Sequence, residues 1–446
     1  MKIMLAVFKA DSCLITFLIL LAQAANAAQV QTHKILMTYW SDDTSRYTTY
    51  PIPGSTNQSG TVQQNAALLQ QLDAINVLAY AFLQVDVSGN VYFSHPSVDL
   101  SKKDVQHFCL GQPASCPHAN TASAGNFSAF AKLDNNDHML RKIISIGGAG
   151  SQKTFDNAIN HPKEFIQSAT NIIHAYHLNG IDLDFEPYAF FDLHQGQLYA
   201  QLVLGLRKKL GEQVFISIEV PGDWETLRSI DCPTDTTCSN NLGIIADNAY
   251  VSLMGYDFHG PYYPGAVTGN DSNLYSGSDE PLLPNFYHLS DNQAIEYLTY
   301  MNVPADRILL GFPGYFRAYG GVKASPGSHG LYQPFDKSKT PTYDLGIKGN
   351  GSYRVAQTLL ESGFTPRYVL VNGKISAVYA YKASSQQWIS YDDPASITAK
   401  SDYVVARHLG GMMMWEIGED LPISNPKSLL RSAYAVLFAT QRNTRL

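Results

Sequence analysis

The chain has 446 residues, a formal net charge of −7 and only 15% charged residues, with 27 tyrosines and 20 phenylalanines. An acidic balance disfavours polyanionic partners, so we expect neither nucleic acid nor an anionic membrane surface as a partner. The length permits one large core or two domains. The abundance of tyrosine suits sugar binding, because aromatic faces stack on the apolar faces of pyranose rings.

The first 27 residues have the pattern of a secretory signal peptide. Lys2 and Lys9 give a basic start, residues 13–21 form an apolar core, and residues 25–27, Ala-Asn-Ala, fit a small-residue cleavage site. The apolar core is shorter than the roughly 20 residues that a membrane-spanning helix needs. We therefore expect a secreted protein, extracellular or periplasmic, with no membrane partner after removal of the leader.

Apolar runs that predict strands alternate with amphipathic runs that predict helices along most of the chain. The predicted strands are 34–40, 76–85, 142–146, 180–186, 213–220, 250–256, 307–312 and 411–415. The predicted helices are 63–74, 161–177, 195–210, 291–302 and 395–408, with a last helix beginning at Asn425-Pro426. Such an alternation predicts parallel β/α units that close into a (β/α)8 barrel, whose working face lies at the carboxyl ends of the strands.

Residues 316–391 interrupt this pattern. They are rich in Gly, Ser, Tyr and Lys, with strand-like runs at 368–372, 376–382 and 387–391. We predict a small α+β insertion domain here, between strands seven and eight. The predicted division is then a leader at 1–27, barrel strands one to seven at 28–315, the insertion at 316–391, and strand eight with the last helix at 392–446. We expect a monomer.

Four cysteines remain after removal of the leader: Cys109, Cys116, Cys232 and Cys238. In an oxidising compartment, local disulfides 109–116 and 232–238 are the simplest of the possible pairings. A metal site is less favoured, because neither pair has the two-residue spacing of a zinc knuckle.

Acidic and apolar residues alternate through residues 181–186, Ile-Asp-Leu-Asp-Phe-Glu. On a strand this spacing places Asp182, Asp184 and Glu186 on one face. Like charges this close cannot all ionise out of water, so at least one carboxyl should keep its proton near neutral pH, as general-acid cleavage of a glycosidic bond requires. A solvated strand face and an all-oxygen metal site are the alternatives. Both are less favoured, because exposed strands seldom stack acids and no histidine or calcium-type glycine loop accompanies them. We expect no metal and no cofactor.

These residues resemble glycoside hydrolase family 18, specifically the secreted chitinases. The family pattern Asp-x-x-Asp-x-Asp-x-Glu on strand four corresponds to residues 179–186 here. Further motifs follow in the family's order across nearly the whole mature chain. They are Ser145-Ile-Gly147-Gly148, Met254-Gly-Tyr256-Asp257, Gly314-Tyr315-Phe316-Arg317, Tyr391-Asp392-Asp393-Pro394, and Gly410-Gly411-Met-Met-Met-Trp415-Glu416.

The resemblance implies hydrolysis of chitin or N-acetylglucosamine oligosaccharides with retention, the substrate's own acetamido oxygen attacking C1 in place of a protein nucleophile. Glu186 would be the general acid and then the base. Asp184 would hold the acetamido N–H and stabilise the oxazolinium-like intermediate, and Asp182 would share a proton with Asp184. Tyr256 would donate to the acetamido oxygen.

The resemblance also implies a cleft in which Trp415 is the floor under one sugar and Arg317 donates to sugar oxygens. Taken alone, Trp415 is better explained as core packing, and Arg317 by pairing with a surface acid. Two positions depart from the family pattern. Asn179 replaces the first Asp, at a position expected to be structural, and Ala149 stands where many chitinases carry Trp. The implied cleft residues are Tyr39, Phe82, Met254, Asp257, Tyr315, Arg317 and Trp415.

Two other functions fit the same fold. One is a chitin-oligosaccharide lectin without turnover, which the presence of Glu186 disfavours. The other is an endoglycosidase acting on N-glycans or peptidoglycan. The insertion at 316–391 favours a chitinase over the latter, because in the family it builds one wall of a deep cleft.

Overall fold

The computed structural model describes residues 34–41, 70–100, 126–134, 139–186, 193–232, 238–262, 267–280 and 288–439. The predicted leader, the predicted 109–116 disulfide and most of the predicted helix 63–74 lie outside these ranges. From Ile35 onward the chain forms one compact unit. None of the helices within the described ranges is both long and apolar enough to cross a membrane.

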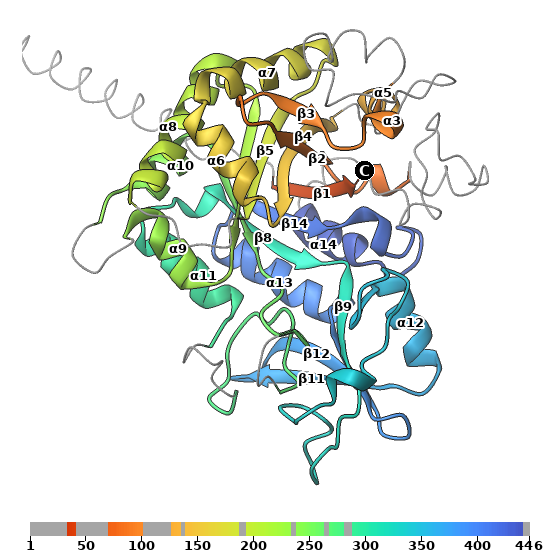
Figure 1. The fold of residues 1–446 in the computed structure, drawn as a ribbon. Helices are drawn as coiled ribbons and strands as arrows, with labels where there is room; N and C mark the ends of the chain where they lie inside the picture. The colour runs from red at the N-terminus through yellow and green to blue at the C-terminus, as the bar shows by residue number, and fades with distance from the viewer. Residues whose placement is uncertain are drawn as a thin grey trace, which may run out of the picture. The chain divides into compact units, whose positions relative to one another are not determined.

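A closed barrel of parallel strands forms the larger part of this unit, as the sequence predicts (Figure 1). The ring closes because β1 pairs in parallel with both β2 and β14. A short strand, β3 (Val91–Phe93), pairs in antiparallel orientation with the carboxyl-terminal end of β2, at residues 83–85. The barrel strands are β1 (Ile35–Ser41), β2 (Val77–Val85), β4 (Arg141–Ala149), β5 (Gly180–Glu186), β6 (Phe215–Pro221), β7 (Tyr250–Met254), β8 (Ile308–Pro313) and β14 (Gly411–Trp415).

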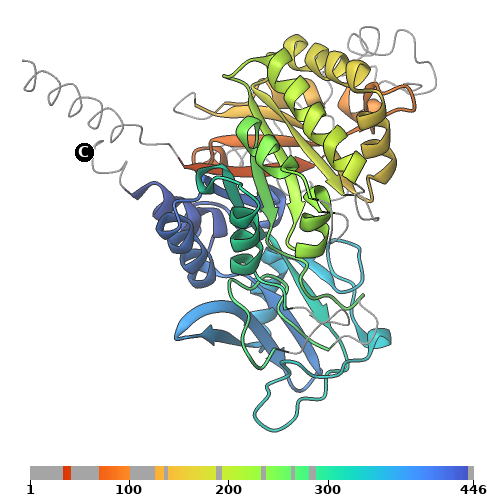
Figure 2. The ribbon, with the colours of Figure 1, turned by 90° about the vertical axis from the view of Figure 1, so that its left-hand side faces the viewer.

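Helices surround the barrel on its outer side, as Figures 1 and 2 show. The sequence did not predict the three short helices α6, α9 and α10. The last helix begins at Leu429 and not at Pro426, because the Ser428 hydroxyl accepts a hydrogen bond from Arg431 N (3.2 Å) and caps the helix there. The surrounding helices are α6 (Gln152–Asn160), α7 (Pro162–Ala175), α8 (Leu193–Leu210), α9 (Trp224–Asp231), α10 (Asn241–Asn248), α11 (Asp291–Tyr300), α13 (Pro394–Ala406) and α14 (Leu429–Leu437). Two more short helices, α3 (Pro96–Asp99) and α5 (Asn126–Ala131), lie between β3 and β4 in the chain.

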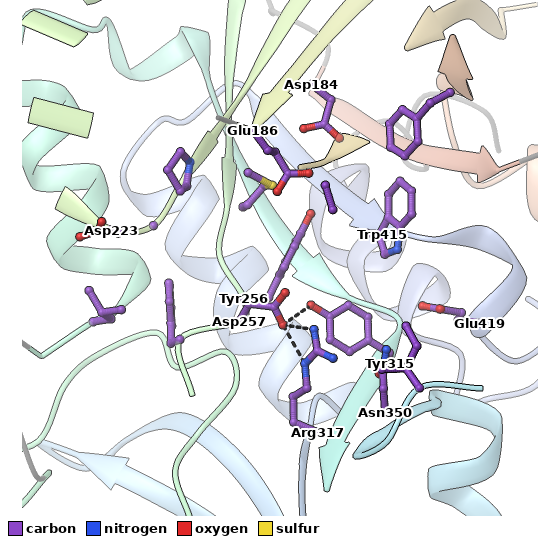
Figure 3. A pocket seen from close by; sticks show the side chains of 18 residues that line it. Asp184, Glu186, Asp223, Tyr256, Asp257, Tyr315, Arg317, Asn350, Trp415 and Glu419 are labelled. Carbon is purple, nitrogen blue, oxygen red and sulfur yellow. Dashed lines mark hydrogen bonds and ion pairs between the residues drawn. The ribbon is translucent and has the colours of Figure 1, made fainter. Parts of the chain in front are cut away.

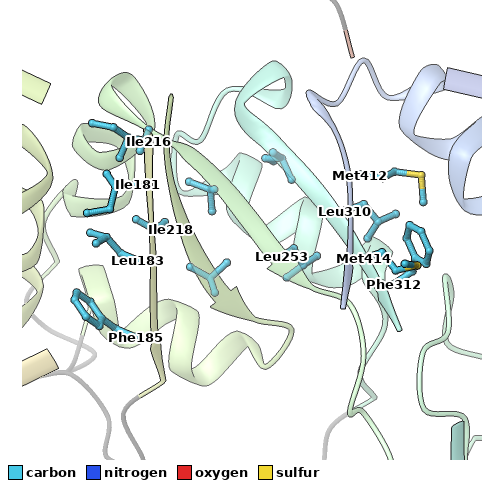
Figure 4. Close-up of a cluster of buried hydrophobic side chains, with 14 of the residues drawn as sticks. Ile181, Leu183, Phe185, Ile216, Ile218, Leu253, Leu310, Phe312, Met412 and Met414 are labelled. Carbon is cyan, nitrogen blue, oxygen red and sulfur yellow. The ribbon is translucent and has the colours of Figure 1, made fainter. Parts of the chain in front are cut away.

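The main hydrophobic core lies between the barrel and this helical layer. Ile181, Leu183 and Phe185 belong to it, and Figure 4 shows them beside the apolar side chains of β6, β7, β8 and β14. Burying a side chain of this kind contributes roughly 1.5–3 kcal/mol. The alternation read in residues 181–186 therefore fixes β5 in one register: a slip by one residue would place three acids in the core and three apolar side chains inside the barrel.

A second sheet, entirely antiparallel, comes from the segment between β8 and β14, which confirms the predicted α+β insertion. Its strand order is β10-β9-β13-β12-β11. The sequence predicted three of these strands but not β9, which follows β8 after a single residue, or the very short β10. The elements are β9 (Tyr315–Tyr319), β10 (Asn350–Ser352), α12 (Tyr353–Glu361), β11 (Thr365–Val371), β12 (Lys374–Lys382) and β13 (Gln387–Tyr391).

A buried ion cluster joins α13 to the loops at the barrel mouth. Lys400 is fully buried, and its Nζ lies 2.8 Å from Asp392 Oδ2 and 3.8 Å from Asp291 Oδ2. The same ammonium group donates to Ser272 Oγ. Removal of one charged partner would leave a buried charge uncompensated, so the cluster is costly to break. The hydrogen bond from Lys400 ties the segment around Ser272 to this cluster.

The described residues include one disulfide, Cys232–Cys238, which follows α9 and has a Cα–Cα distance of 4.2 Å. This confirms one of the two predicted pairs.

Candidate active site

A cavity of about 390 Å³ opens at the carboxyl ends of the barrel strands and is bordered by the insertion (Figure 3). Its wall comes from segments far apart in the chain, as expected for a barrel mouth. The lining residues are Phe82, Ala149, Asp184, Glu186, Pro221, Gly222, Asp223, Met254, Tyr256, Asp257, Phe258, Leu289, Tyr315, Arg317, Ile347, Asn350, Trp415 and Glu419.

The structure brings the predicted site residues together, in two layers. Every predicted cleft residue except Tyr39, and every predicted catalytic residue except Asp182, lines this cavity. Tyr39 (1% exposed) and Asp182 (0% exposed) lie deeper inside the barrel. Their place is therefore behind the wall of the cleft, where they contact the residues that line it.

Asp182 is the innermost of the three acids on β5 and the best hydrogen-bonded. Ser145 Oγ and Ser217 Oγ each donate to it at 2.7 Å, and Tyr39 Oη lies 3.0 Å from its Oδ2. Burial raises the pKa of Asp182 to about 6, although these hydroxyl groups lower it in part.

Asp184 and Glu186 have fewer partners. Asp184 is 4% exposed, and its Oδ1 has no hydrogen-bond partner within the described structure. Burial, followed by the charges of Glu186 and Asp182, raises the pKa of Asp184 well above its usual range. Burial, followed by the charge of Asp257, raises the pKa of Glu186 to about 7. At neutral pH a large fraction of Glu186 is thus protonated, as a general acid requires.

The backbone of β4 fits closely against β5 at these acids. Gly147 has a φ of 126°, and a Cβ there would lie 2.0 Å from the carbonyl oxygen of Asp184. Just beyond, Ser151 Oγ accepts from Glu186 N at 2.8 Å and donates to Asp184 O at 3.3 Å. The glycine motif thus allows the close approach that positions Asp184 and Glu186.

Aromatic rings form one side of the cavity. Phe82 and Trp415 stack with ring centroids 5.3 Å apart and an interplanar angle of 8°. Tyr39 supports Trp415 from below, at a centroid distance of 5.1 Å. Trp415 belongs to the barrel-interior cluster and also lines the cavity, so it can pack and bind a sugar face at once.

Asp257, Tyr315 and Arg317 form a hydrogen-bonded group where the cavity meets β9 of the insertion (Figure 3). Asp257 Oδ1 accepts from Tyr315 Oη at 2.9 Å and from Arg317 Nε at 2.8 Å. Arg317 thus pairs with a residue of the site itself. Asp257 has a φ of 62°, and its N–H donates to Asp271 Oδ1 at 3.2 Å. Asp271 precedes Ser272, which the buried Lys400 holds.

Tyr256 extends from the end of β7 toward Glu186 (Figure 3). Its hydroxyl group donates to Met413 Sδ at 3.9 Å. A thioether is a weak acceptor. A carbonyl oxygen that enters the cavity would therefore replace Met413 Sδ as the acceptor of the hydrogen bond from Tyr256.

The sequence reasoning missed a fourth acid inside the barrel, Glu219 on β6. It is 3% exposed, and its Oε1 lies 2.7 Å from Tyr39 Oη. Burial, followed by the charges of Asp182 and Asp184, raises the pKa of Glu219 well above its usual range. A signal was present, because Ser217 and Glu219 alternate with apolar residues in a buried strand just as the acids of β5 do.

The two departures from the family pattern lie in different places. Ala149 borders the cavity, so the missing Trp removes one aromatic ring from that stretch of the wall, where the ring of Phe82 lies against the neighbouring Gly148. Asn179 precedes β5, away from the cavity. Its Oδ1 accepts from Lys142 N at 2.9 Å, and its N–H donates to Lys142 O at 2.8 Å.

We expect Asn179→Asp to change the free energy of unfolding by less than about 0.5 kcal/mol and kcat by less than about twofold. The exposed carboxylate would keep the oxygen that accepts from Lys142 N and would stay solvated. Urea unfolding and steady-state kinetics check this. Asn179→Ala, which loses the acceptor, is the comparison, and equal behaviour of the two variants would show that this hydrogen bond is unimportant.

The fold and the site define a barrel protein with an acid-containing, aromatic cleft bordered by an insertion domain. The profile of the glycosyl hydrolases family 18 matches residues 36–420, and the chain belongs to this family. Chitinase 1 of Aphanocladium album is 26% identical over 354 residues, which cover 77% of this chain and 75% of that protein. The oviduct-specific glycoprotein of Sus scrofa is 24% identical, with 66% of this chain and 54% of that protein covered. The Group IV chitinase of Ostrinia furnacalis, solved in complex with allosamidin, has a TM-score of 0.68 at 20% identity, covering 91% of this chain and 99% of that one.

Proposed function

We propose that the protein is a chitinase that hydrolyses β-1,4 linkages between N-acetylglucosamine units with retention of anomeric configuration. One observation carries the proposal: Glu186 lies on the cavity wall with its pKa raised to about 7, next to a buried carboxyl group with an unpaired oxygen. The first feature suits proton donation to a leaving group, and the second suits an acetamido N–H. Membership of the family and the named chitinases among its relatives support the same substrate class.

In the proposed reaction, the face of a sugar lies on Trp415 and its acetamido group lies between Asp184 and Tyr256. Tyr256 donates to the acetamido oxygen and orients it toward C1, while Asp184 accepts from the acetamido N–H. Glu186 gives its proton to the glycosidic oxygen as the C1–O bond breaks and the oxazolinium ring closes. The resulting carboxylate then takes a proton from the water that opens the ring, which restores the acid.

We expect kcat/KM for a soluble N-acetylglucosamine oligomer to fall as the pH rises through about 7. The raised pKa of Glu186 means that the required acid form dominates below that pH and is lost above it. The fall should be about tenfold per pH unit on the alkaline side. Initial rates at low substrate concentration, measured from pH 5 to pH 10 with enzyme stability checked at each pH, test this. An alkaline limb centred near pH 4–5 would show that burial does not raise this pKa.

Binding without turnover is the second candidate, because one relative is named a glycoprotein and not a chitinase. A product profile on N-acetylglucosamine oligomers of increasing length separates the two, since a lectin would bind them and leave them intact. Release of chromophore from a chromogenic chitobioside, but no release of a high-mannose glycan, would separate a chitinase from an N-glycan endoglycosidase. We further propose that the protein is secreted, and the Cys232–Cys238 disulfide supports an oxidising compartment.

A further inference from the structure

Tyr39 lies between two buried carboxyl groups that belong to neighbouring barrel strands. Its Oη is 3.0 Å from Asp182 Oδ2 and 2.7 Å from Glu219 Oε1. A phenol has one proton and donates it to one of these oxygens. The other contact is a hydrogen bond only if the carboxyl group itself supplies the proton. At least one of the two carboxyl groups is therefore a carboxylic acid.

The other hydrogen bonds indicate which of the two groups holds this proton. Asp182 accepts from Ser145 and Ser217, one hydroxyl group on each carboxylate oxygen, and this arrangement stabilises an anion. Glu219 has less support. The hydroxyl group of Ser252 on β7 favours its ionised form, but burial outweighs this effect, and Glu219 Oε2 makes no hydrogen bond within the described structure. An ionised group with an unpaired buried oxygen costs more than a neutral one. The proton therefore belongs to Glu219.

We propose that Glu219 is a positioning residue that stays protonated and donates its hydrogen to Tyr39 Oη, while Tyr39 donates its own to Asp182 Oδ2. The hydroxyl groups of Tyr39, Ser145 and Ser217 then all donate to Asp182, which keeps it a carboxylate next to Asp184. The catalytic consequence depends on the function proposed above, because Asp182 acts through Asp184. The position of the proton does not depend on it.

The charges around Glu219 favour the same protonation state. The titratable groups that face it lie on β1, β5, α8 and the segment after β7, and none of these groups carries a positive charge. Ionisation of Glu219 would add a further negative charge to a cluster of buried acids, which raises its free-energy cost. The facing groups are Tyr39, Asp182, Asp184, Tyr199 and Tyr256.

Infrared spectroscopy tests the position of the proton without a measurement of activity. We expect the wild-type protein at neutral pH to show a C=O stretching band of a carboxylic acid that is absent from Glu219→Gln. Glu212→Gln, a change at an exposed glutamate just before the same strand, should keep the band. Tyr39→Phe should keep the band at a higher frequency, because the acid loses its acceptor. A band that survives unchanged in Glu219→Gln, or that does not move in Tyr39→Phe, would overturn the inference.

The pH profile of kcat/KM gives a second test. Glutamine has the shape of a protonated glutamate, is also neutral and can donate to Tyr39. The apparent pKa values in the pH profile of kcat/KM for Glu219→Gln should therefore stay within about 0.3 units of those of wild type. Glu219→Ala, which has no donor, should lower kcat/KM about tenfold, and the loss should be smaller in Glu219→Gln.

If Glu219 were ionised, its replacement by glutamine would remove a negative charge and move the profile to lower pH by about one unit or more. That result would overturn the proposal that Glu219 is protonated and donates to Tyr39, and it would leave the proposed role of Glu186 intact. Conversely, a failure of the chitinase proposal would leave the infrared result unaffected, so the two failures can be told apart.

Discussion

Replacement of Glu186 by glutamine is expected to lower kcat on N-acetylglucosamine oligomers by about a thousandfold, with oligomer binding kept within a few-fold. Glutamine fills the same space on the cavity wall but has no proton to give to the glycosidic oxygen. General acid–base catalysis contributes about 10²- to 10⁴-fold in enzymes, and here the same side chain serves in both half-reactions. The stacked rings of Phe82 and Trp415, which should hold the sugar, lie elsewhere in the cavity and are unaltered.

Hydrolysis of a tetramer followed by chromatography measures kcat, and tryptophan fluorescence titration measures Kd, because Trp415 lines the cavity. Glu361→Gln, at an exposed glutamate on α12, is the matched control and should behave as wild type. A variant of Glu186 that cleaves the tetramer at the wild-type rate would contradict the proposed mechanism. A variant that loses binding as well would assign Glu186 to recognition of the substrate.

Much of the fold follows from alternation that is visible in the sequence. Each barrel strand has one face against the helices, so short apolar runs separated by helical runs suffice to predict the barrel. The acids of β5 could be predicted as a group for the same reason: Ile181, Leu183 and Phe185 fix the register, and the acids then have only the inside of the barrel to face. Local periodicity is enough when one face of a strand is fully buried.

Contacts between strands could not be predicted in this way. Tyr39 and Glu219 are 180 residues apart in sequence and meet only because β1 and β6 face each other across the barrel interior. The pairing of Arg317 with Asp257 depends on β9 beginning one residue after β8, which has no distinct signal in the sequence. The same applies to the depth of Tyr39, which the family resemblance placed in the cleft and the structure places beneath Trp415.

These long-range contacts give the three acids of β5 different environments although they share one face of one strand. Asp182 accepts from two serine hydroxyl groups, Asp184 has an unpaired oxygen, and Glu186 borders the cavity. Because environment separates the roles of carboxyl groups on one strand face, variants at alternate positions of β5 should fail in different ways. Asp184 is the sharpest case.

Asp184→Asn is expected to lower kcat about 10²- to 10³-fold with a change in KM of less than about threefold. In the proposed reaction, Asp184 meets positive charge only when the acetamido oxygen has attacked C1, so its main contribution appears in the transition state. Asparagine keeps the shape, and its oxygen can still accept from the acetamido N–H, which preserves binding of the ground state. It supplies no charge to the developing oxazolinium ion. Steady-state kinetics on a soluble oligomer separate kcat from KM.

Asp223→Asn is the matched control, because Asp223 borders the same cavity while its carboxylate accepts from Thr226 Oγ1 at 2.8 Å at the start of α9. Its effect on kcat should stay below about threefold. If both variants lost activity equally, the general negative potential of the cavity would be responsible. If Asp184→Asn raised KM and left kcat unchanged, Asp184 would bind substrate without stabilising the intermediate. The negative charge of Asp184, which burial makes costly in the resting protein, would then not contribute to stabilising the transition state.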